Sequence, residues 1–125
     1  MKRLIDTSGW VEYFLGTNSG KKIKEIIENE EVYMSSMTFA EISKWVQINN
    51  LDLDLILEKI KSSSVVIHPD EGILVQSGKI YLDLRKLRNK ISLIDAIIYT
   101  TSIANGINLV TKDNDFRNLV SVEMI

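Results

Sequence analysis

Short apolar runs alternate with longer amphipathic stretches along this chain. The short runs predict strands at residues 4–5, 32–34, 65–67, 107–110 and 120–122. Between them, helical spacing of apolar residues predicts helices at residues 10–14, 21–30, 38–48, 53–60, 71–87 and 92–104, with a short turn or helix at 115–118. Strands separated by helices favour right-handed crossovers and a parallel sheet covered on both faces. We therefore expect an α/β fold, a three-layer α/β/α sandwich around a parallel sheet of about five short strands.

Polar residues mark where several of these helices begin and end. We expect Ser19 to cap the second helix, Ser92 to begin the last long one, and Asn105–Gly106 to end it. In the long helix that follows Asp70, a helical repeat predicts the inner face, which consists of Ile73, Ser77, Ile80, Leu84 and Leu87.

The composition narrows the class of protein. The 125 residues are 45% hydrophobic and 26% charged, which is typical of one globular domain spanning residues 1–125 and excludes a disordered chain. Because the chain has no cysteine and one histidine, His68, disulfides, thiolate sites and histidine-rich zinc sites are excluded. The first residues do not form a signal peptide, and the longest uncharged run, Ala96–Thr111, is too short to span a membrane. We therefore expect a cytoplasmic protein with no membrane partner.

Four acidic residues follow strands or begin helices in this pattern. Asp6 ends the first strand, and Asp113 follows the fourth, with Asp115 two residues further on. Glu41 and Asp95 each lie in the first turn of a predicted helix. Because strand carboxyl ends and the helix starts that follow them share one edge of a parallel sheet, we expect these side chains to converge there.

Converging carboxylates repel one another, so they either take up protons or bind a cation. Oxygen ligands without histidine or cysteine select a hard ion, which predicts one or two Mg²⁺ or Mn²⁺ ions. Such an ion favours a phosphate ligand and an activated water, and this chemistry points to phosphodiester hydrolysis.

Local structure offers a second interpretation of each acid. Thr38-x-x-Glu41 and Ser92-x-x-Asp95 both fit the capping box, in which the acid bonds back to the first residue of its helix. Residues 6–9 also fit a polar turn into a helix, and residues 113–115 fit an Asx turn. Both interpretations stay open at this point.

Four segments, in order, resemble the acidic motifs of PIN domains: Leu4–Trp10, Ser35–Ile42, Ile91–Ile98 and Leu109–Phe116. The resemblance is closest to the VapC-type toxins of toxin–antitoxin pairs. It implies a metal-dependent endoribonuclease with Asp6, Glu41, Asp95 and Asp113 as the catalytic and metal-binding acids. Asp115 is a further possible ligand, and the hydroxyls that would support the site are those of Thr7, Ser8, Ser92 and Thr111. The implied partners are an RNA substrate, a cognate antitoxin and a second copy of the chain.

Basic residues supply candidate RNA contacts, although the chain has a net charge of −2. A cluster of Arg85, Lys86, Arg88 and Lys90 precedes the Asp95 helix, and Lys112 is adjacent to Asp113. The cluster fits either phosphate binding or a solvated helix end. If the four converging acids are committed to a metal, the rest of the chain is slightly basic, so the negative net charge does not exclude RNA.

Two other functional classes fit the sequence less well. Phosphoaspartyl phosphatases need a second acid two residues after the first, where this chain has Ser8. Receiver domains need an aspartate after the third strand, where His68 and Pro69 stand. The alternative that remains is a catalytically inactive PIN-like scaffold that binds protein.

Overall fold

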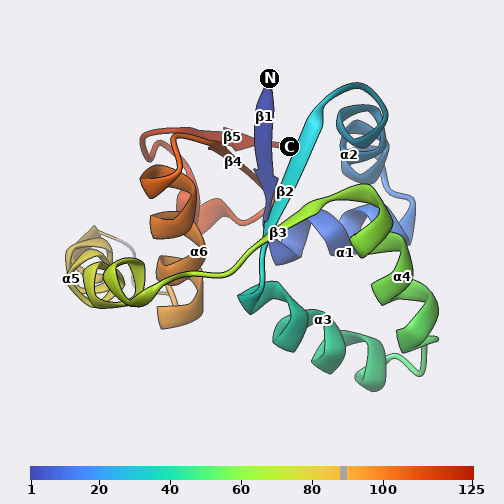
Figure 1. Ribbon diagram of the computed structural model, residues 1–125, viewed down its shortest axis with the longest axis horizontal. Helices are drawn as coiled ribbons and strands as arrows, with labels where there is room; N and C mark the ends of the chain where they lie inside the picture. The colour runs from blue at the N-terminus through green and yellow to red at the C-terminus, as the bar shows by residue number, and fades with distance from the viewer. Residues whose placement is uncertain (88–89) are drawn as a thin grey trace.

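The computed structural model describes residues 1–87 and 90–125. In this part of the chain, five parallel strands form one sheet in the order β3-β2-β1-β4-β5 (Figure 1). The strands are β1 (Lys2–Ile5), β2 (Glu31–Ser35), β3 (Val65–Ile67), β4 (Asn108–Thr111) and β5 (Val122–Met124). The predicted parallel sheet is therefore confirmed.

The last strand begins two residues later than the sequence pattern predicts. Residues 120–121 form a turn, in which Ser121 has the left-handed backbone angle φ 60. This turn, rather than the apolar Val120, precedes the point where β5 pairs with β4. Val120 is accordingly exposed.

Helices cover both faces of the sheet, as predicted (Figure 1). Helices α1 to α4 pack on one side, and α5 and α6 lie on the other. The bounds are α1 (Thr7–Leu15), α2 (Asn18–Asn29), α3 (Met37–Ile48), α4 (Leu53–Ser63), α5 (Glu71–Leu87) and α6 (Leu93–Ala104), followed by a 3₁₀ turn, η1 (Asn114–Phe116). The architecture is thus the expected three-layer α/β/α sandwich.

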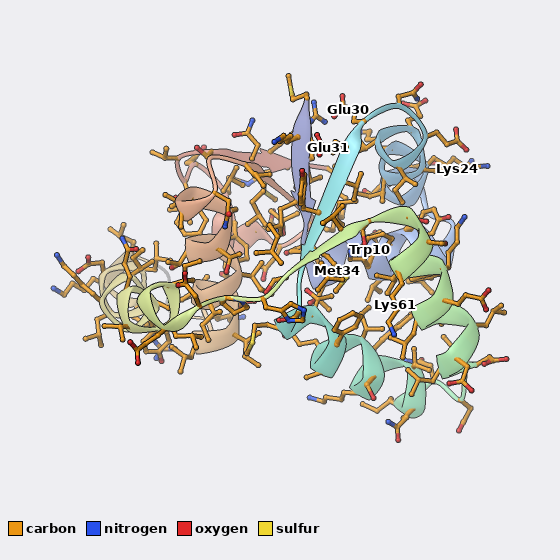
Figure 2. The ribbon with its side chains drawn as sticks, viewed as in Figure 1. Trp10, Lys24, Glu30, Glu31, Met34 and Lys61 are labelled. Carbon is orange, nitrogen blue, oxygen red and sulfur yellow. The ribbon has the colours of Figure 1, made fainter. Side chains whose placement is uncertain are left out.

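Alternation along the strands builds two apolar cores. Successive strand side chains point to opposite faces, so Leu4 packs with α5 and α6 while Ile5 packs with α1 to α4. The core around Ile5 also contains the fully buried Trp10 of α1 and Met34 of β2, which lie between the sheet and these helices (Figure 2). These cores hold the strand ends in fixed positions, and the candidate site is built on those ends.

The start of α2 differs from the prediction. Thr17, not Ser19, caps this helix, because the Thr17 hydroxyl accepts a hydrogen bond from the Gly20 amide at 3.0 Å. Ser19 is buried inside the first turn. Gly20 permits this arrangement, since a Cβ atom there would lie 2.0 Å from the Glu12 carbonyl oxygen of α1.

Helix α5 packs along α6, at the side of the molecule (Figure 1). Ser77 and Leu84 are buried, as the predicted inner face requires. Leu87 is 71% exposed, so the prediction that it belongs to this face is wrong. The last buried residue of α5 is Leu84, one helical turn before Leu87.

No helix in residues 1–87 or 90–125 is both long enough and apolar enough to cross a membrane.

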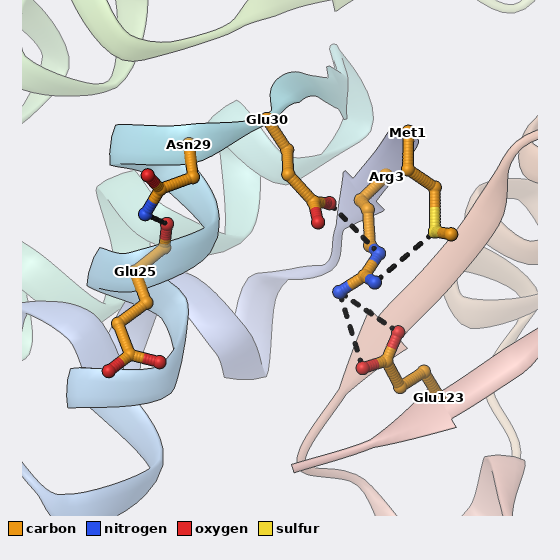
Figure 3. Close-up of polar contacts among 6 residues, drawn as sticks. All are labelled: Met1, Arg3, Glu25, Asn29, Glu30 and Glu123. Carbon is orange, nitrogen blue, oxygen red and sulfur yellow. Dashed lines mark hydrogen bonds and ion pairs between the residues drawn. The ribbon is translucent and has the colours of Figure 1, made fainter.

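A charged cluster that the sequence pattern did not reveal lies at the amino-terminal end of the sheet (Figure 3). The guanidinium of Arg3 on β1 forms ion pairs at 3.1 Å with Glu30, after α2, and at 3.1 Å with Glu123 on β5. This cluster ties β1 to one helix and to the edge strand. Arg3 precedes Asp6 by three residues, so the cluster and the acids lie at opposite ends of β1.

Candidate active site

The acids lie where the strand order of the sheet reverses. The chain runs from β1 outward through β2 to β3 and then returns to place β4 on the other side of β1. Ligands of open α/β sheets bind at such a switch point, outside the carboxyl ends of the strands. Asp6 follows β1 and Asp113 follows β4, so these two acids flank the switch point.

A cleft of ≈ 350 Å³ opens at this edge of the sheet. Its walls include all four predicted acids, which come from four separate segments of the chain, together with several residues around them: Asp6, Thr7, Ser8, Val11, Glu12, Glu41, Asp95, Ile98, Lys112 and Asp113. The convergence expected from the positions of the acids is therefore present in the structure.

Asp6 is the most buried of the four acids, at 4% exposure. It caps α1, and its Oδ1 accepts hydrogen bonds from the Gly9 amide at 2.9 Å and the Ser8 hydroxyl at 2.7 Å. Its Oδ2 accepts one from the Thr111 hydroxyl at 2.6 Å. Burial raises the pKa of Asp6 to about 6, and these three hydrogen bonds oppose the rise. The polar-turn interpretation of residues 6–9 is thus correct, and the same carboxylate also lines the cleft.

Two hydroxyls connect the β1–α1 junction to the end of β4. The Ser8 hydroxyl accepts a hydrogen bond from the Lys112 amide at 3.0 Å, and it lies 3.2 Å from the Thr111 hydroxyl. The Thr111 hydroxyl accepts one from the Asp113 amide at 2.9 Å. Each hydroxyl thus holds Asp6 on one side and the segment that carries Asp113 on the other.

Glu41 lies one turn into α3. Its capping-box interpretation is wrong, because α3 begins before Thr38 and its first flanking residue, Ser36, makes no side-chain cap. The Thr7 hydroxyl instead donates to Glu41 at 2.5 Å. Burial raises the pKa of Glu41, this hydrogen bond lowers it, and the charge of Asp95 raises it again.

Asp95 serves as a cap and also lines the cleft. The predicted capping box with Ser92 is present: the Ser92 amide donates to Asp95 Oδ2 at 3.1 Å, and the Asp95 amide donates to the Ser92 hydroxyl at 3.0 Å. Burial nevertheless raises the pKa of Asp95, with contributions from the charges of Asp113 and Asp115. The capping and cleft interpretations therefore both hold for this residue.

Asp113 likewise takes part in local structure and lines the cleft. Its Oδ1 accepts a hydrogen bond from the Asp115 amide at 2.9 Å, which is the Asx turn considered from the sequence. Asp113 also lines the cleft, whereas Asp115 is not among the lining residues and acts on Asp95 only through its charge.

A family model of the PIN domain matches residues 3–121 of this chain. The chain belongs to the PIN domain family. Its fold is similar to VapBC2 from Rickettsia felis, solved with a promoter DNA fragment, at TM-score 0.77 and 19% identity, covering 100% of this chain and 99% of that one. It is also similar to Mycobacterium tuberculosis VapC20, described as a sarcin-ricin loop cleaving toxin, at TM-score 0.76 and 19% identity, covering 97% and 98%. A toxin–antitoxin complex from Klebsiella pneumoniae matches at TM-score 0.73 and 22% identity, covering 97% and 95%. Among curated protein sequences, none matches this chain.

The donor set of this PIN domain fits a hard divalent cation. The four acids supply only oxygen ligands, and the charge of Asp113 helps to raise the pKa of each of the other three acids. A carboxylate has about four acceptor sites, and Asp6 uses three of them within the protein. In the described residues, however, no three acidic or histidine side chains gather closely enough to hold an ion as they stand. Binding would therefore need water ligands or small side-chain rotations.

The basic residues fall into two groups. Lys112 lines the cleft beside Asp113. Arg85 and Lys86 do not line it, and the Arg85 guanidinium donates to the Ile91 carbonyl at 3.3 Å and lies over the Tyr81 ring. Arg88 lies outside the described residues.

Glu12 is a cleft residue that the sequence reasoning missed. It follows Ser8 by four residues in α1, so the two side chains share one face of that helix. This helical spacing is the signal that would have found it. The Glu12 carboxylate already accepts a hydrogen bond from the Thr17 hydroxyl at 3.2 Å, beside the cap of α2.

Proposed function

We propose that this PIN domain, acting as one unit over residues 1–125, is a divalent-metal-dependent endoribonuclease and the toxin of a toxin–antitoxin pair. One observation carries the proposal: four carboxylates from distant segments line a single cleft at the switch point of the sheet. Burial raises the pKa of Asp6, Glu41 and Asp95, so holding these groups as carboxylates is costly unless a cation binds them, and the arrangement favours a metal site. The fold shared with solved VapC toxins supports the same conclusion.

Each acid has a distinct proposed task. Asp6 and Asp95 would hold Mg²⁺ or Mn²⁺ most directly, and Asp113 and Glu41 would complete the shell, partly through waters. A bound ion would lower the pKa of a coordinated water and neutralise charge on the phosphate. Glu41 is suited to accept the proton of the attacking water, because burial raises its pKa and the Thr7 hydroxyl fixes its position. Lys112, beside Asp113, would contact the phosphate. Hydrolysis would leave a 5′-phosphate and a 3′-hydroxyl.

The proposed partners are an antitoxin and a second copy of the chain. Structures with this fold were solved as toxin–antitoxin complexes, including one from Salmonella typhimurium bound to DNA. The outer face of α5 supports a homodimer, because Val75 and Leu82 are 74% and 61% exposed and lie two helical turns apart. We propose that the toxin acts in the cytoplasm, on RNA.

The test is RNA cleavage by the purified chain with Mg²⁺, with Mn²⁺ and with a chelator. We expect cleavage only with the metal, and its loss in Asp113→Asn. Asparagine keeps the oxygen that accepts from the Asp115 amide, so this substitution removes a charge without removing the turn. The matched control is Asp83→Asn, on the exposed surface of α5, which should cleave as the parent does. Full activity in Asp113→Asn would contradict the proposal.

Metal binding without catalysis separates the nuclease from the inactive scaffold. We expect Mn²⁺ to raise the melting temperature of the parent, because an ion that binds only the folded state stabilises it. Asp113→Asn should show a smaller rise, and Asp83→Asn the full rise. A parent with no thermal shift and no cleavage would favour the scaffold.

A further inference from the structure

An apolar hollow continues from the acidic cleft along α3. It has a volume of ≈ 520 Å³ and shares Thr7, Val11 and Glu41 with the cleft. Beyond these shared residues its walls are mostly apolar and come from α3 and the start of α6: Ala40, Lys44, Trp45, Ile48 and Ile94. The hollow therefore adjoins the cleft through these three shared residues.

The helical register of α3 explains this lining. Glu41, Lys44, Trp45 and Ile48 are spaced i, i+3, i+4 and i+7, so they form one stripe on the helix surface. Trp45 lies about 6 Å along the helix axis from Glu41, at about 1.5 Å per residue. The stripe thus leads from a carboxylate of the cleft to an aromatic side chain.

The exposure along the stripe shows that the hollow is open to a ligand. Lys44 is exposed, Trp45 is half-buried against the core, and Ile48 is 67% exposed. The core contact fixes the tryptophan in place while part of its side chain stays accessible. A pre-positioned aromatic side chain loses little conformational entropy when a flat ligand stacks on it.

The charge beside the hollow favours a nucleotide over an apolar peptide. Lys44 lines the hollow one helical turn from Glu41, which the hollow shares with the cleft, so a cation lies at the boundary between the two. Apolar walls, an aromatic side chain and one adjacent cation match a nucleobase joined to an anionic backbone. An apolar peptide side chain would use the apolar walls but not the cation.

We propose that this hollow binds one unpaired base of a single-stranded RNA, next to the phosphate held in the acidic cleft. Trp45 stacks on the base, and Lys44 contacts the phosphate that joins this nucleotide to the next. A base can enter only when it is neither paired nor stacked in a helix, so the hollow selects single-stranded segments. This inference rests on the proposed nuclease function and names a substrate subsite for it.

The test measures binding rather than cleavage, in an Asp113→Asn background that leaves the RNA intact. The probes are a labelled oligoadenylate and an abasic oligomer of the same length and charge, followed by fluorescence anisotropy. We expect Trp45→Leu to weaken oligoadenylate binding by about 5-fold to about 100-fold, because base–aromatic stacking supplies that much affinity. Binding of the abasic oligomer should not change.

Two further variants separate stacking from charge and from folding. Lys44→Gln should weaken binding of both oligomers. It should also reduce the slope of the logarithm of the binding constant against the logarithm of salt concentration by about one, the value expected for one lost phosphate contact. Phe39→Leu is the matched control: Phe39 is a half-buried aromatic residue of the same helix that contacts Lys61 of α4 and does not line the hollow. It should leave both affinities unchanged. Urea unfolding of each variant verifies that it is folded.

The inference is overturned if Trp45→Leu weakens neither oligomer, weakens both equally, or behaves as Phe39→Leu does. It is also overturned if the Asp113→Asn parent binds neither probe. A wild-type chain that cleaves RNA while Trp45→Leu leaves binding unchanged would reject the base subsite alone. A wild-type chain that cleaves no RNA with either metal would instead reject the nuclease.

Discussion

Replacing Asp6 with asparagine should stabilise the metal-free protein. Asp6 is almost completely buried, and burial raises its pKa from the usual 3.8 to about 6. At neutral pH the folded protein therefore holds a carboxylate that would be more stable in the unfolded chain. Asparagine has a similar size and no charge, and its oxygen can still accept hydrogen bonds from the Gly9 amide and the Ser8 hydroxyl.

The magnitude follows from the change in pKa. A rise of about two pH units corresponds to about 3 kcal/mol of lost stability when the group is fully ionised. Asparagine recovers this loss, but its amide nitrogen cannot accept the hydrogen bond that the Thr111 hydroxyl donates, which costs about 1 kcal/mol. We therefore expect Asp6→Asn to raise the free energy of unfolding by about 1–3 kcal/mol above pH 6.

The pH dependence has a definite sign. The folded state binds the Asp6 proton more tightly than the unfolded state does, so wild-type stability falls as pH rises from 3.8 through about 6. Below that range residue 6 is uncharged in both the wild type and Asp6→Asn, so the greater stability of the variant should disappear. Glu41 and Asp95 also have raised pKa values, but they contribute equally to wild type and variant.

The assay is urea unfolding of both proteins with a chelator, at about pH 7.5 and about pH 4.5. Asp83→Asn is the control, and an exposed substitution of this kind should change stability by less than about 0.5 kcal/mol at either pH. Adding Mg²⁺ should then narrow the gap at the higher pH, because the ion stabilises the wild type more. The reasoning is refuted if Asp6→Asn is less stable than wild type by the same amount at both pH values.

Three further substitutions test the surroundings of the site. Gly20→Ala should destabilise the chain by more than about 3 kcal/mol, because the new Cβ atom would meet the Glu12 carbonyl oxygen at 2.0 Å. At Gly78 a Cβ atom would meet no other atom within 4 Å, so Gly78→Ala should instead stabilise the chain by about 0.5–1 kcal/mol in the same urea titration. Thr111→Val removes a buried hydroxyl that bonds Asp6 at 2.6 Å, so we expect a cost of about 1–3 kcal/mol and at least a tenfold slower cleavage, with recovery in Thr111→Ser. Arg3→Met breaks the ion pairs at the far end of β1. It should lower the free energy of unfolding by about 1–3 kcal/mol and leave the cleavage rate per folded molecule unchanged. A slower rate would contradict this and show that the Arg3 end of β1 influences the site.

Local pattern was sufficient to predict the sheet and the edge on which the acids lie. Apolar runs and helical spacing involve only neighbouring residues, so they can be recognised in the sequence. Crossover helices between the strands then make the sheet parallel, which places the carboxyl ends of its strands at one edge. That is why Asp6 and Asp113, which are far apart in the chain, were expected in one cleft and lie there.

Spacing alone could not decide what each acid contacts. The patterns of Thr38 with Glu41 and Ser92 with Asp95 are equivalent in sequence, yet only the second forms a capping box. Helix α3 begins before Thr38, and the Thr7 hydroxyl from α1 then lies within reach of Glu41. The difference depends on how two helices pack, which no local pattern contains.

The sequence by itself thus determined the parallel α/β class, a set of acidic side chains with no cysteine beside them, and the positions of the four acids in the chain. Only the tertiary structure decided the burial of Asp6, its bond to Thr111, the ion pairs of Arg3 and the hollow beside Trp45. The pairing of Ile5 with Val110 brings Asp6 beside Thr111, across 105 residues of chain. Hydrogen bonds and cavities of this kind arise from the register of strands and the packing of side chains, and these are properties of the whole fold rather than of any segment.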